Sequence, residues 1–236
     1  MLPKHQQYIR DKFAHAAVAL EPFPHLHIRD VLPPELYQEM EAALPPQREV
    51  KGAIRRDQLR RWMRRAWRRP KPDPVYFYVS ADAKAGHLDR YASEWQRRFG
   101  DYLVLVENLL HERFRIQEPW LSGQRVFFFR PAGWAIQPHV HPSAELTNTM
   151  IYFPSAENTV EQGTLLYRPR ANGPLAASQV TVEHKRDELE PVAIIPFLPN
   201  TLISWINTPT AMHGSIEIAG GAQRRYLYFV SLRKDH

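Results

Sequence analysis

The chain has 236 residues and a formal net charge of +6, and this length fits one domain with a sizeable core. It contains no cysteine, which excludes disulfides, thiolate metal sites and cysteine nucleophiles. Its polar start lacks a signal-type apolar segment, and no run approaches the roughly 18 apolar residues of a membrane span. We therefore expect a cytoplasmic protein without membrane contacts.

Residues 1–118 carry the patterns of helices interrupted by prolines. We expect helices over residues 6–20, 35–44 and 88–114, with a short strand leading into the second of them. A strand-like aromatic run follows at residues 75–79. The N-terminal half is therefore predicted to be mainly helical.

Eight arginines lie between Arg55 and Arg69, in doublets that recur every four or five positions. On a helix this spacing forms one basic stripe. The stripe is either a solvated face or a docking site for an anion, such as a phosphate-bearing substrate or a carrier protein. No zinc finger, basic zipper or ribonucleoprotein motif accompanies it, so nucleic acid is a minor alternative. The oligomeric state stays open.

Residues 119–236 consist of short β-rich runs separated by Gly, Pro and Asn. Strands at this spacing are typical of an antiparallel sandwich or barrel. We therefore predict an α+β fold with a single domain over 1–236, in which the helical half packs on a C-terminal jelly roll with an open mouth. The expected strands are Arg125–Arg130, Thr149–Phe153, Gly163–Arg168, Gln179–Val182, Val192–Ile195, Leu202–Ile206 and Tyr226–Leu232.

Three histidines form the pattern that carries chemistry. If residues 135–141 are a strand, His139 and His141 project from the same face. His213, on a separate segment, can complete the set from a neighbouring strand. A lone histidine is usually an ordinary core or surface residue, but neutral imidazole is the commonest protein ligand for iron, copper or zinc. The trio therefore predicts a metal site.

The order of the motifs resembles the iron(II)/2-oxoglutarate-dependent oxygenases of the prolyl-hydroxylase and phytanoyl type. Gly133-Trp-Ala-Ile-Gln-Pro-His139 is similar to the family's approach to its first iron ligand. The run that begins at Pro199 and ends at His213-Gly is similar to the segment that precedes the distal histidine in the family. Ten residues then separate His213 from Arg224, a spacing that matches the arginine that binds the distal carboxylate of 2-oxoglutarate.

This resemblance implies a double-stranded β-helix in which His139, His141 and His213 bind Fe(II) and Arg224 anchors 2-oxoglutarate. With O2, such an enzyme releases succinate and CO2 and oxidises, by default hydroxylates, its substrate. The substrate is expected to be a small molecule or a carrier-linked group, anionic if the basic stripe docks it.

Arg224 also has a reading from the residues alone. A strand arginine is most often a surface charge, but Arg224 and Arg225 must point to opposite faces. If Arg224 faces inward, its buried guanidinium needs an anion, and a dicarboxylate accepts its planar fork. Tyr152 and Asn148 are further candidates for contacts with cosubstrate or substrate; otherwise they are a core tyrosine and a turn asparagine.

One position departs from the oxygenase pattern. The family's first motif is His-x-Asp or His-x-Glu, whereas the carboxylate position here is His141. A facial triad of two histidines and one carboxylate leaves three metal positions open. A third imidazole keeps this geometry but removes one negative charge.

The same run supports a second interpretation. The spacing of Gly133, His139, His141 and Glu145 also fits the first motif of cupins, which are jelly rolls in which the glutamate binds the metal. The second cupin motif fits less well, because its Pro-x-Gly is missing close before His213. The alternatives are therefore a cupin-type dioxygenase or isomerase that uses Glu145 and no 2-oxoglutarate, or a non-catalytic binding module on the same fold.

Overall fold

The structure is a computed structural model of the whole chain. It describes residues 1–46, 78–80, 89–130, 132–170, 182–218, 222 and 224–234. The basic segment Arg55–Arg69 lies outside the described residues, so its helix and its docking role stay predictions. In the described part of the chain, no helix is long and apolar enough to cross a membrane.

Two antiparallel sheets form the centre of the molecule. The large sheet has the order β1-β2-β10-β6-β12-β4-β3, and the small sheet has the order β8-β5-β11-β7-β9. The strands of the large sheet are β1 (Val18–Ala19), β2 (His25–Ile28), β3 (Tyr78–Ser80), β4 (Trp120–Arg130), β6 (Glu145–Tyr152), β10 (Leu202–Ile206) and β12 (Arg224–Arg233). Those of the small sheet are β5 (Ile136–Val140), β7 (Thr164–Pro169), β8 (Val182–Glu183), β9 (Leu189–Ile195) and β11 (His213–Ser215).

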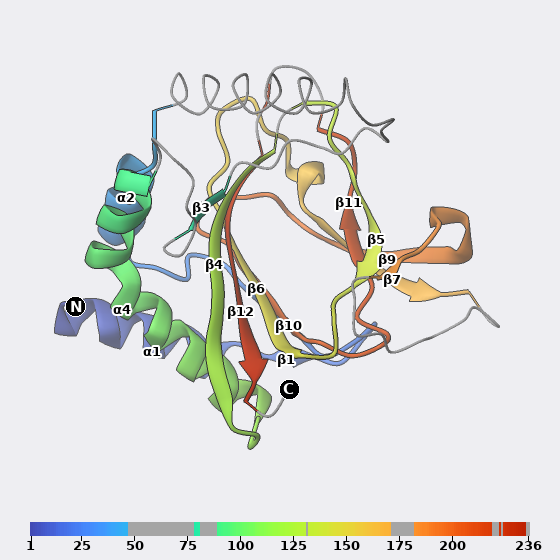
Figure 1. Ribbon diagram of the computed structural model, residues 1–236, viewed down its shortest axis with the longest axis horizontal. Coiled ribbons are helices and arrows are strands. Elements are labelled where there is room, and N and C mark those ends of the chain that lie inside the picture. The colour runs from blue at the N-terminus through green and yellow to red at the C-terminus, as the bar shows by residue number, and fades with distance from the viewer. Residues whose placement is uncertain are drawn as a thin grey trace, which may run out of the picture.

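Helices α1 (Pro3–His15), α2 (Pro34–Ala42) and α4 (Asp89–Phe114) pack on one side of the large sheet, and the small sheet lies on the other side (Figure 1). One apolar cluster joins these helices to the outer face of the large sheet. A second cluster fills the space between the two sheets and includes Met150, Tyr152 and Trp205. The molecule thus has three layers, and the large sheet is buried on both faces.

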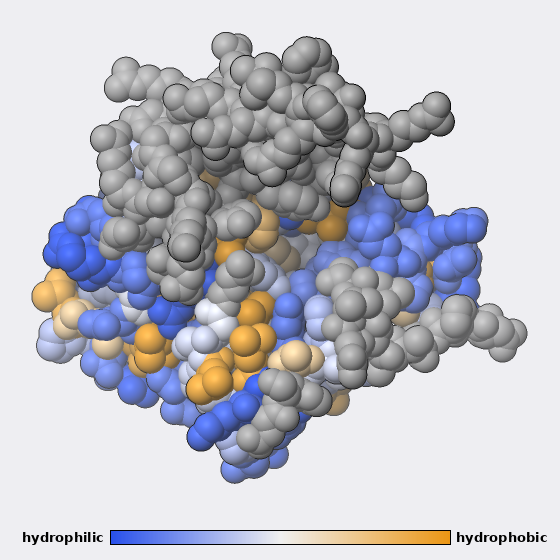
Figure 2. Space-filling model, viewed as in Figure 1, coloured by the Kyte–Doolittle hydropathy of each residue, from blue (hydrophilic) through white to orange (hydrophobic). Residues whose placement is uncertain are grey.

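Figure 2 shows, in the same view, how hydrophobic and hydrophilic residues are distributed over the surface. Hydrophobic groups gather in the central region, between the helices and the small sheet. The right-hand side of the view, over the small sheet, is mostly hydrophilic.

The mainly β character of the C-terminal half is confirmed, and β4, β6, β7, β9, β10 and β12 overlap the predicted β-rich runs, whereas β11 lies outside them. The longest helix begins within one residue of its predicted start. The first helix was predicted over residues 6–20, and this was wrong: it spans Pro3–His15, and Ala16 is already extended. Val18 and Ala19 instead pair with β2. In the described part of the N-terminal half, β1 is thus the strand that was not predicted, whereas β2 and β3 lie at the predicted short strand and aromatic run.

Candidate metal and anion site

The structure brings together the three histidines that the sequence pattern groups. Strands β5 and β11 pair with His139 directly opposite His213, and His141 follows the end of β5. Gly214 permits this pairing, since a Cβ there would lie 2.7 Å from the carbonyl oxygen of Ile136. One nitrogen from each of the three rings lies within 4.8 Å of the other two.

Hydrogen bonds on the far side of the rings orient this cluster. Nδ1 of His139 lies 2.9 Å from the carbonyl oxygen of Gln137, and Nδ1 of His213 lies 3.1 Å from that of Ala211. A carbonyl oxygen only accepts, so both Nδ1 atoms carry the proton and both Nε2 atoms keep a lone pair. The Nε2 atoms of His141 and His213 face each other at 3.2 Å. The rings are therefore set to bind one ion through Nε2.

The protonation state suits a metal. Burial lowers the pKa of His139 to about 3, and the nearby His141 adds to the effect. Burial, followed by the neighbouring imidazoles, also holds the pKa of His213 well below its usual value. Both rings are neutral at neutral pH, which is the form that coordinates a metal ion.

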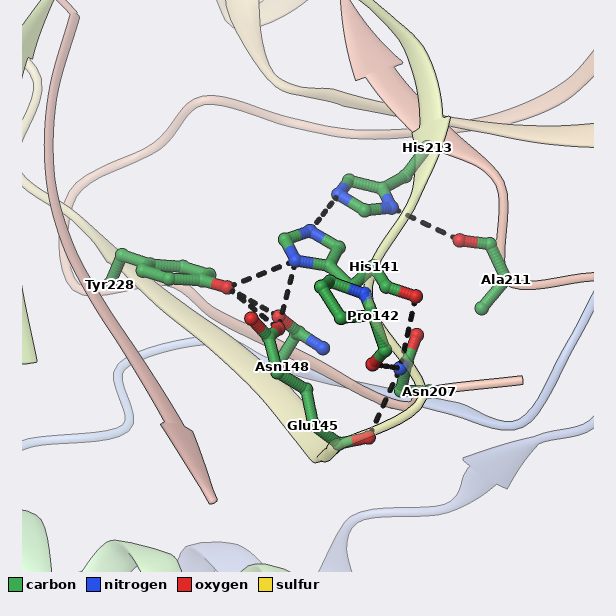
Figure 3. A network of polar contacts seen from close by, with 8 residues as sticks. All are labelled: His141, Pro142, Glu145, Asn148, Asn207, Ala211, His213 and Tyr228. Atoms are coloured by element: carbon green, nitrogen blue, oxygen red, sulfur yellow. Dashed lines mark hydrogen bonds and ion pairs between the residues drawn. The ribbon is translucent and has the colours of Figure 1, made fainter. Parts of the chain in front are cut away.

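Glu145 approaches the cluster from the other side of His141. Its Oε2 lies 2.9 Å from Nδ1 of His141, and the hydroxyl of Tyr228 lies 3.3 Å from each of these two atoms (Figure 3). Tyr228 also donates to Oδ1 of Asn148. Burial and then the charge of Glu145 raise the pKa of Tyr228 well above its usual value, so its hydroxyl keeps its proton. Glu145 thus lies outside the group of converging ligand atoms.

The histidines open into a cavity of about 450 Å³. Most of its wall comes from the facing sides of the two sheets. Besides the histidines and Glu145, the wall contains Arg224 and the aromatic side chains of Phe128, Trp134, Tyr226 and Tyr228. A cavity of this size is typical of a site for a small molecule.

Arg224 is 1% exposed, although it carries a full charge. It donates to Oγ1 of Thr164 at 3.1 Å, and its guanidinium lies 5.1 to 5.8 Å from the ring centres of Tyr152, Phe197 and Tyr226. Among the described residues no carboxylate pairs with it, and its Nε has no hydrogen-bond partner. Since a buried charge needs a counter-charge, this part of the cavity suits an anionic group of a ligand.

Arg225 lies on the opposite face of β12, as the strand alternation predicts. Its Nη2 donates to Oε1 of Glu41 on α2 at 2.8 Å, and its Nε donates to the carbonyl oxygen of Phe153. The two neighbouring arginines therefore differ in their partners. Arg225 pairs with a carboxylate outside the cavity, whereas Arg224 faces the cavity and has no carboxylate partner among the described residues.

Tyr152 and Asn148, the softer candidates, lie behind the wall of the cavity. Both are fully buried. The hydroxyl of Tyr152 is 2.5 Å from Oγ1 of Thr164, and Asn148 accepts the hydrogen bond from Tyr228. In the part of the chain that the structure describes, they contact residues of the wall rather than form it. Their predicted contacts with a ligand stay untested.

Two residues without a predicted role support the site. Thr164 lines the cavity beside Arg224. The Nδ2 of Asn207 donates to the carbonyl oxygens of Pro142 at 2.6 Å and Glu145 at 3.0 Å, and so holds the turn that follows His141. Thr164 stands in the strand that follows Gly163, and Asn207 stands in the approach to His213, but neither residue type alone signals these contacts.

No protein-family model and no curated protein matches the sequence. Solved structures do match the fold. AviO1 from Streptomyces viridochromogenes Tue57 aligns over 100% of this chain and 98% of its own, with a TM-score of 0.50 and 12% identity. The epimerase SnoN, in complex with Fe3+, alpha ketoglutarate and nogalamycin RO, aligns over 97% of this chain and 83% of its own, with a TM-score of 0.53 and 11% identity.

SnoN is also described as a non-heme, alpha ketoglutarate-dependent epimerase of nogalamycin biosynthesis. At such low identity the likeness concerns the fold. At the level of the fold, the resemblance that the motifs predict is therefore confirmed: this chain has a fold similar to that of SnoN.

Proposed function

We propose that this protein is an iron(II)- and 2-oxoglutarate-dependent oxygenase that oxidises, by default hydroxylates, a small-molecule or carrier-linked substrate. One observation carries the proposal. A single cavity contains three imidazoles with one ring nitrogen each within 4.8 Å of the others, and a buried arginine that lacks a carboxylate partner among the described residues. A ligand that chelates a metal at one end and ends in a carboxylate suits both groups, and 2-oxoglutarate has this form.

We also assign the two sheets to a double-stranded β-helix within one domain over residues 1–236. Strands β4, β12, β6 and β10 are neighbours in the large sheet, and β5, β11, β7 and β9 are neighbours in the small sheet. Along the chain these strands pass from one sheet to the other, apart from β7 and β9. The N-terminal part belongs to the same domain because β1, β2 and β3 complete the large sheet.

The chain's own residues have distinct roles in this proposal. His139, His141 and His213 hold the metal on one face, and Arg224 with Thr164 binds the far carboxylate of the cosubstrate. When bound, iron(II) with 2-oxoglutarate and O2 supplies the oxidising chemistry, with release of succinate and CO2. The aromatic wall excludes water from the reacting groups and orients the substrate. The SnoN complex supports this scheme, because a related fold holds both iron and alpha ketoglutarate.

The cupin alternative assigns Glu145 to the metal and gives Arg224 no role. The position of Glu145 beside Nδ1 of His141 favours the oxygenase instead, because the other nitrogen of this ring, Nε2, is the one that faces His213. The non-catalytic alternative predicts that the protein lacks a bound metal and turnover.

The test is aerobic incubation of the iron-loaded protein with 2-oxoglutarate and a pool of metabolites, in which succinate release is measured. We expect release that depends on both iron and 2-oxoglutarate and that rises when the substrate is present. Calorimetry with the manganese-loaded protein measures cosubstrate binding without turnover. Iron binding without any 2-oxoglutarate binding would contradict the oxygenase and favour the cupin alternative.

A further inference from the structure

The metal site proposed above lacks a negatively charged ligand. Two histidines and one carboxylate around Fe(II) leave a net charge of +1, whereas three neutral imidazoles leave +2. The more positive centre is a poorer host for the oxidised metal. A negative group close to one of the imidazoles would offset this difference, since charges in a partly dry interior interact strongly.

Glu145 is placed to do so. Its Oε2 lies 2.9 Å from Nδ1 of His141, while Nε2 of the same ring faces His213 (Figure 3). Both side chains are partly shielded, with 13% of His141 and 20% of Glu145 exposed. A carboxylate that accepts from a ligand histidine fixes the tautomer of the ring and raises its strength as a ligand.

The surrounding residues hold Glu145 in this position. Asn207 donates to the backbone of Pro142 and Glu145, which fixes the turn between the histidine and the carboxylate. Tyr228 contacts Oε2 of Glu145 and is itself tied to Asn148 (Figure 3). These partners come from three separate parts of the chain, and together they fix the carboxylate more firmly than a single chance contact on the surface would.

We propose that Glu145 is a positioning residue that acts through His141 as the negative charge that the ligand set lacks. This inference rests on the proposed iron site but not on 2-oxoglutarate. Glu145 holds Nε2 of His141 toward the metal, strengthens iron binding and stabilises Fe(III) relative to Fe(II).

The test compares Glu145→Gln in two backgrounds, the native chain and His141→Asp, which moves the charge into the ligand set. Iron(II) affinity and the reduction potential of the bound iron are measured without 2-oxoglutarate. In the native background we expect affinity to fall about ten- to a hundred-fold, as for other partners of ligand histidines, and the potential to rise. In the His141→Asp background the same substitution should change iron affinity by less than about three-fold. There the ligand set already carries a negative charge, so the effects of the two substitutions are not additive.

Glu183→Gln is the matched control, since it removes another carboxylate from the cavity wall. It should leave affinity and potential near the native values. An equal effect of Glu183→Gln would mean that only the general charge of the cavity matters. An equal loss from Glu145→Gln in both backgrounds would mean that Glu145 is itself a ligand or has a structural role. Either result overturns the proposal.

If Glu145→Gln takes up no iron, the double variant decides, because the proposal requires it to bind iron again. Failure of the double variant, when His141→Asp alone binds iron, also overturns the proposal. Failure of the proposed function has a different signature. In that case the native protein binds no iron, or binds iron but not 2-oxoglutarate.

Discussion

The two sheets contribute to one site, but they are built differently. The large sheet is covered by helices on its outer face, and Leu227 on that face is 2% exposed. On the edge strand β9 of the small sheet, Val192 and Ile194 are 39% and 40% exposed. The small sheet nevertheless holds His139 and His213, whereas the large sheet supplies Arg224. The difference predicts that substitutions in the large sheet affect mainly the stability of the fold, and that substitutions of the histidines in the small sheet affect mainly the proposed metal binding.

The largest expected effect is on metal binding by the small sheet. Replacement of His139 or His213 by alanine removes one of three ligands, so we expect iron content to fall from about one ion per chain to near zero, as a three-ligand site requires. Metal analysis of the purified variants measures this. The control is His27→Ala, an exposed histidine on β2. Full occupancy in both cavity variants would place the metal elsewhere.

The next prediction concerns stability. Leu227→Ala opens a space in the packed layer between the large sheet and the helices, and we expect a loss of about 2–5 kcal/mol in the free energy of unfolding. Val192→Ala, on the exposed face of β9, should change it by no more than about 0.5–1 kcal/mol. Chemical denaturation of both variants makes the comparison. Similar losses at the two positions would refute the contrast between the sheets.

Arg224 tests the contribution of the large sheet to the ligand. Charge-assisted hydrogen bonds of this kind contribute about 1.5–3 kcal/mol, so Arg224→Leu should weaken 2-oxoglutarate binding about ten- to a hundred-fold. Iron content should not change. Calorimetry with the manganese-loaded protein measures the effect, and Arg225→Leu is the control because that side chain faces Glu41. Native-like affinity in Arg224→Leu would show that the anchor is misassigned.

The smallest expected effect is a pH dependence of the free energy of unfolding that comes from His111 on helix α4, which packs on the large sheet. Burial lowers the pKa of His111 to about 4, and the ring contacts Oγ of Ser231 at 2.8 Å. The unfolded chain therefore binds a proton near pH 6.5 that the folded chain binds only near pH 4. The lowered pKa of His111 therefore does not reduce the free energy of unfolding above pH 6.5, but it reduces this free energy progressively as the pH falls toward 4.

The metal-free His111→Phe variant should lose less stability over this interval, by about 1–3 kcal/mol. Denaturation curves between pH 7 and pH 4 measure the difference. His15→Phe, at an exposed position, should keep the native change of the free energy of unfolding with pH. An unchanged pH dependence in His111→Phe would show that this ring titrates normally.

Local patterns in the sequence were enough to predict a large part of this protein. The spacing of apolar residues predicts helix α4, and the β-rich runs predict most strands of both sheets but not β1 or β11. Strand alternation predicts that His139 and His141 share one face and that Arg224 and Arg225 do not. These predictions succeed because side-chain direction within one element depends only on the backbone period.

The remaining features were decided by contacts between residues far apart in the chain. The first helix ends at His15 because Val18 and Ala19 pair with β2, and no pattern within residues 6–20 reports that pairing. The register of β5 and β11 sets His213 opposite His139. These two strands are far apart in the chain, and the local sequence of neither strand specifies this register. Asn207 likewise reaches Glu145 only because β10 lies beside β6.

Glu145 shows the distinction most directly. Its spacing from His139 and His141 fits a cupin ligand, and from the sequence alone that role stays open. The folded chain instead places its carboxylate at Nδ1 of His141, because the turn held by Asn207 directs it to that side of the ring. Local patterns were enough to predict the candidate residues of the site, whereas the atom of each residue that faces a given partner followed from the folded chain. The physical reason is that such distances depend on strand register and turn geometry, which are set by the packing of the whole chain.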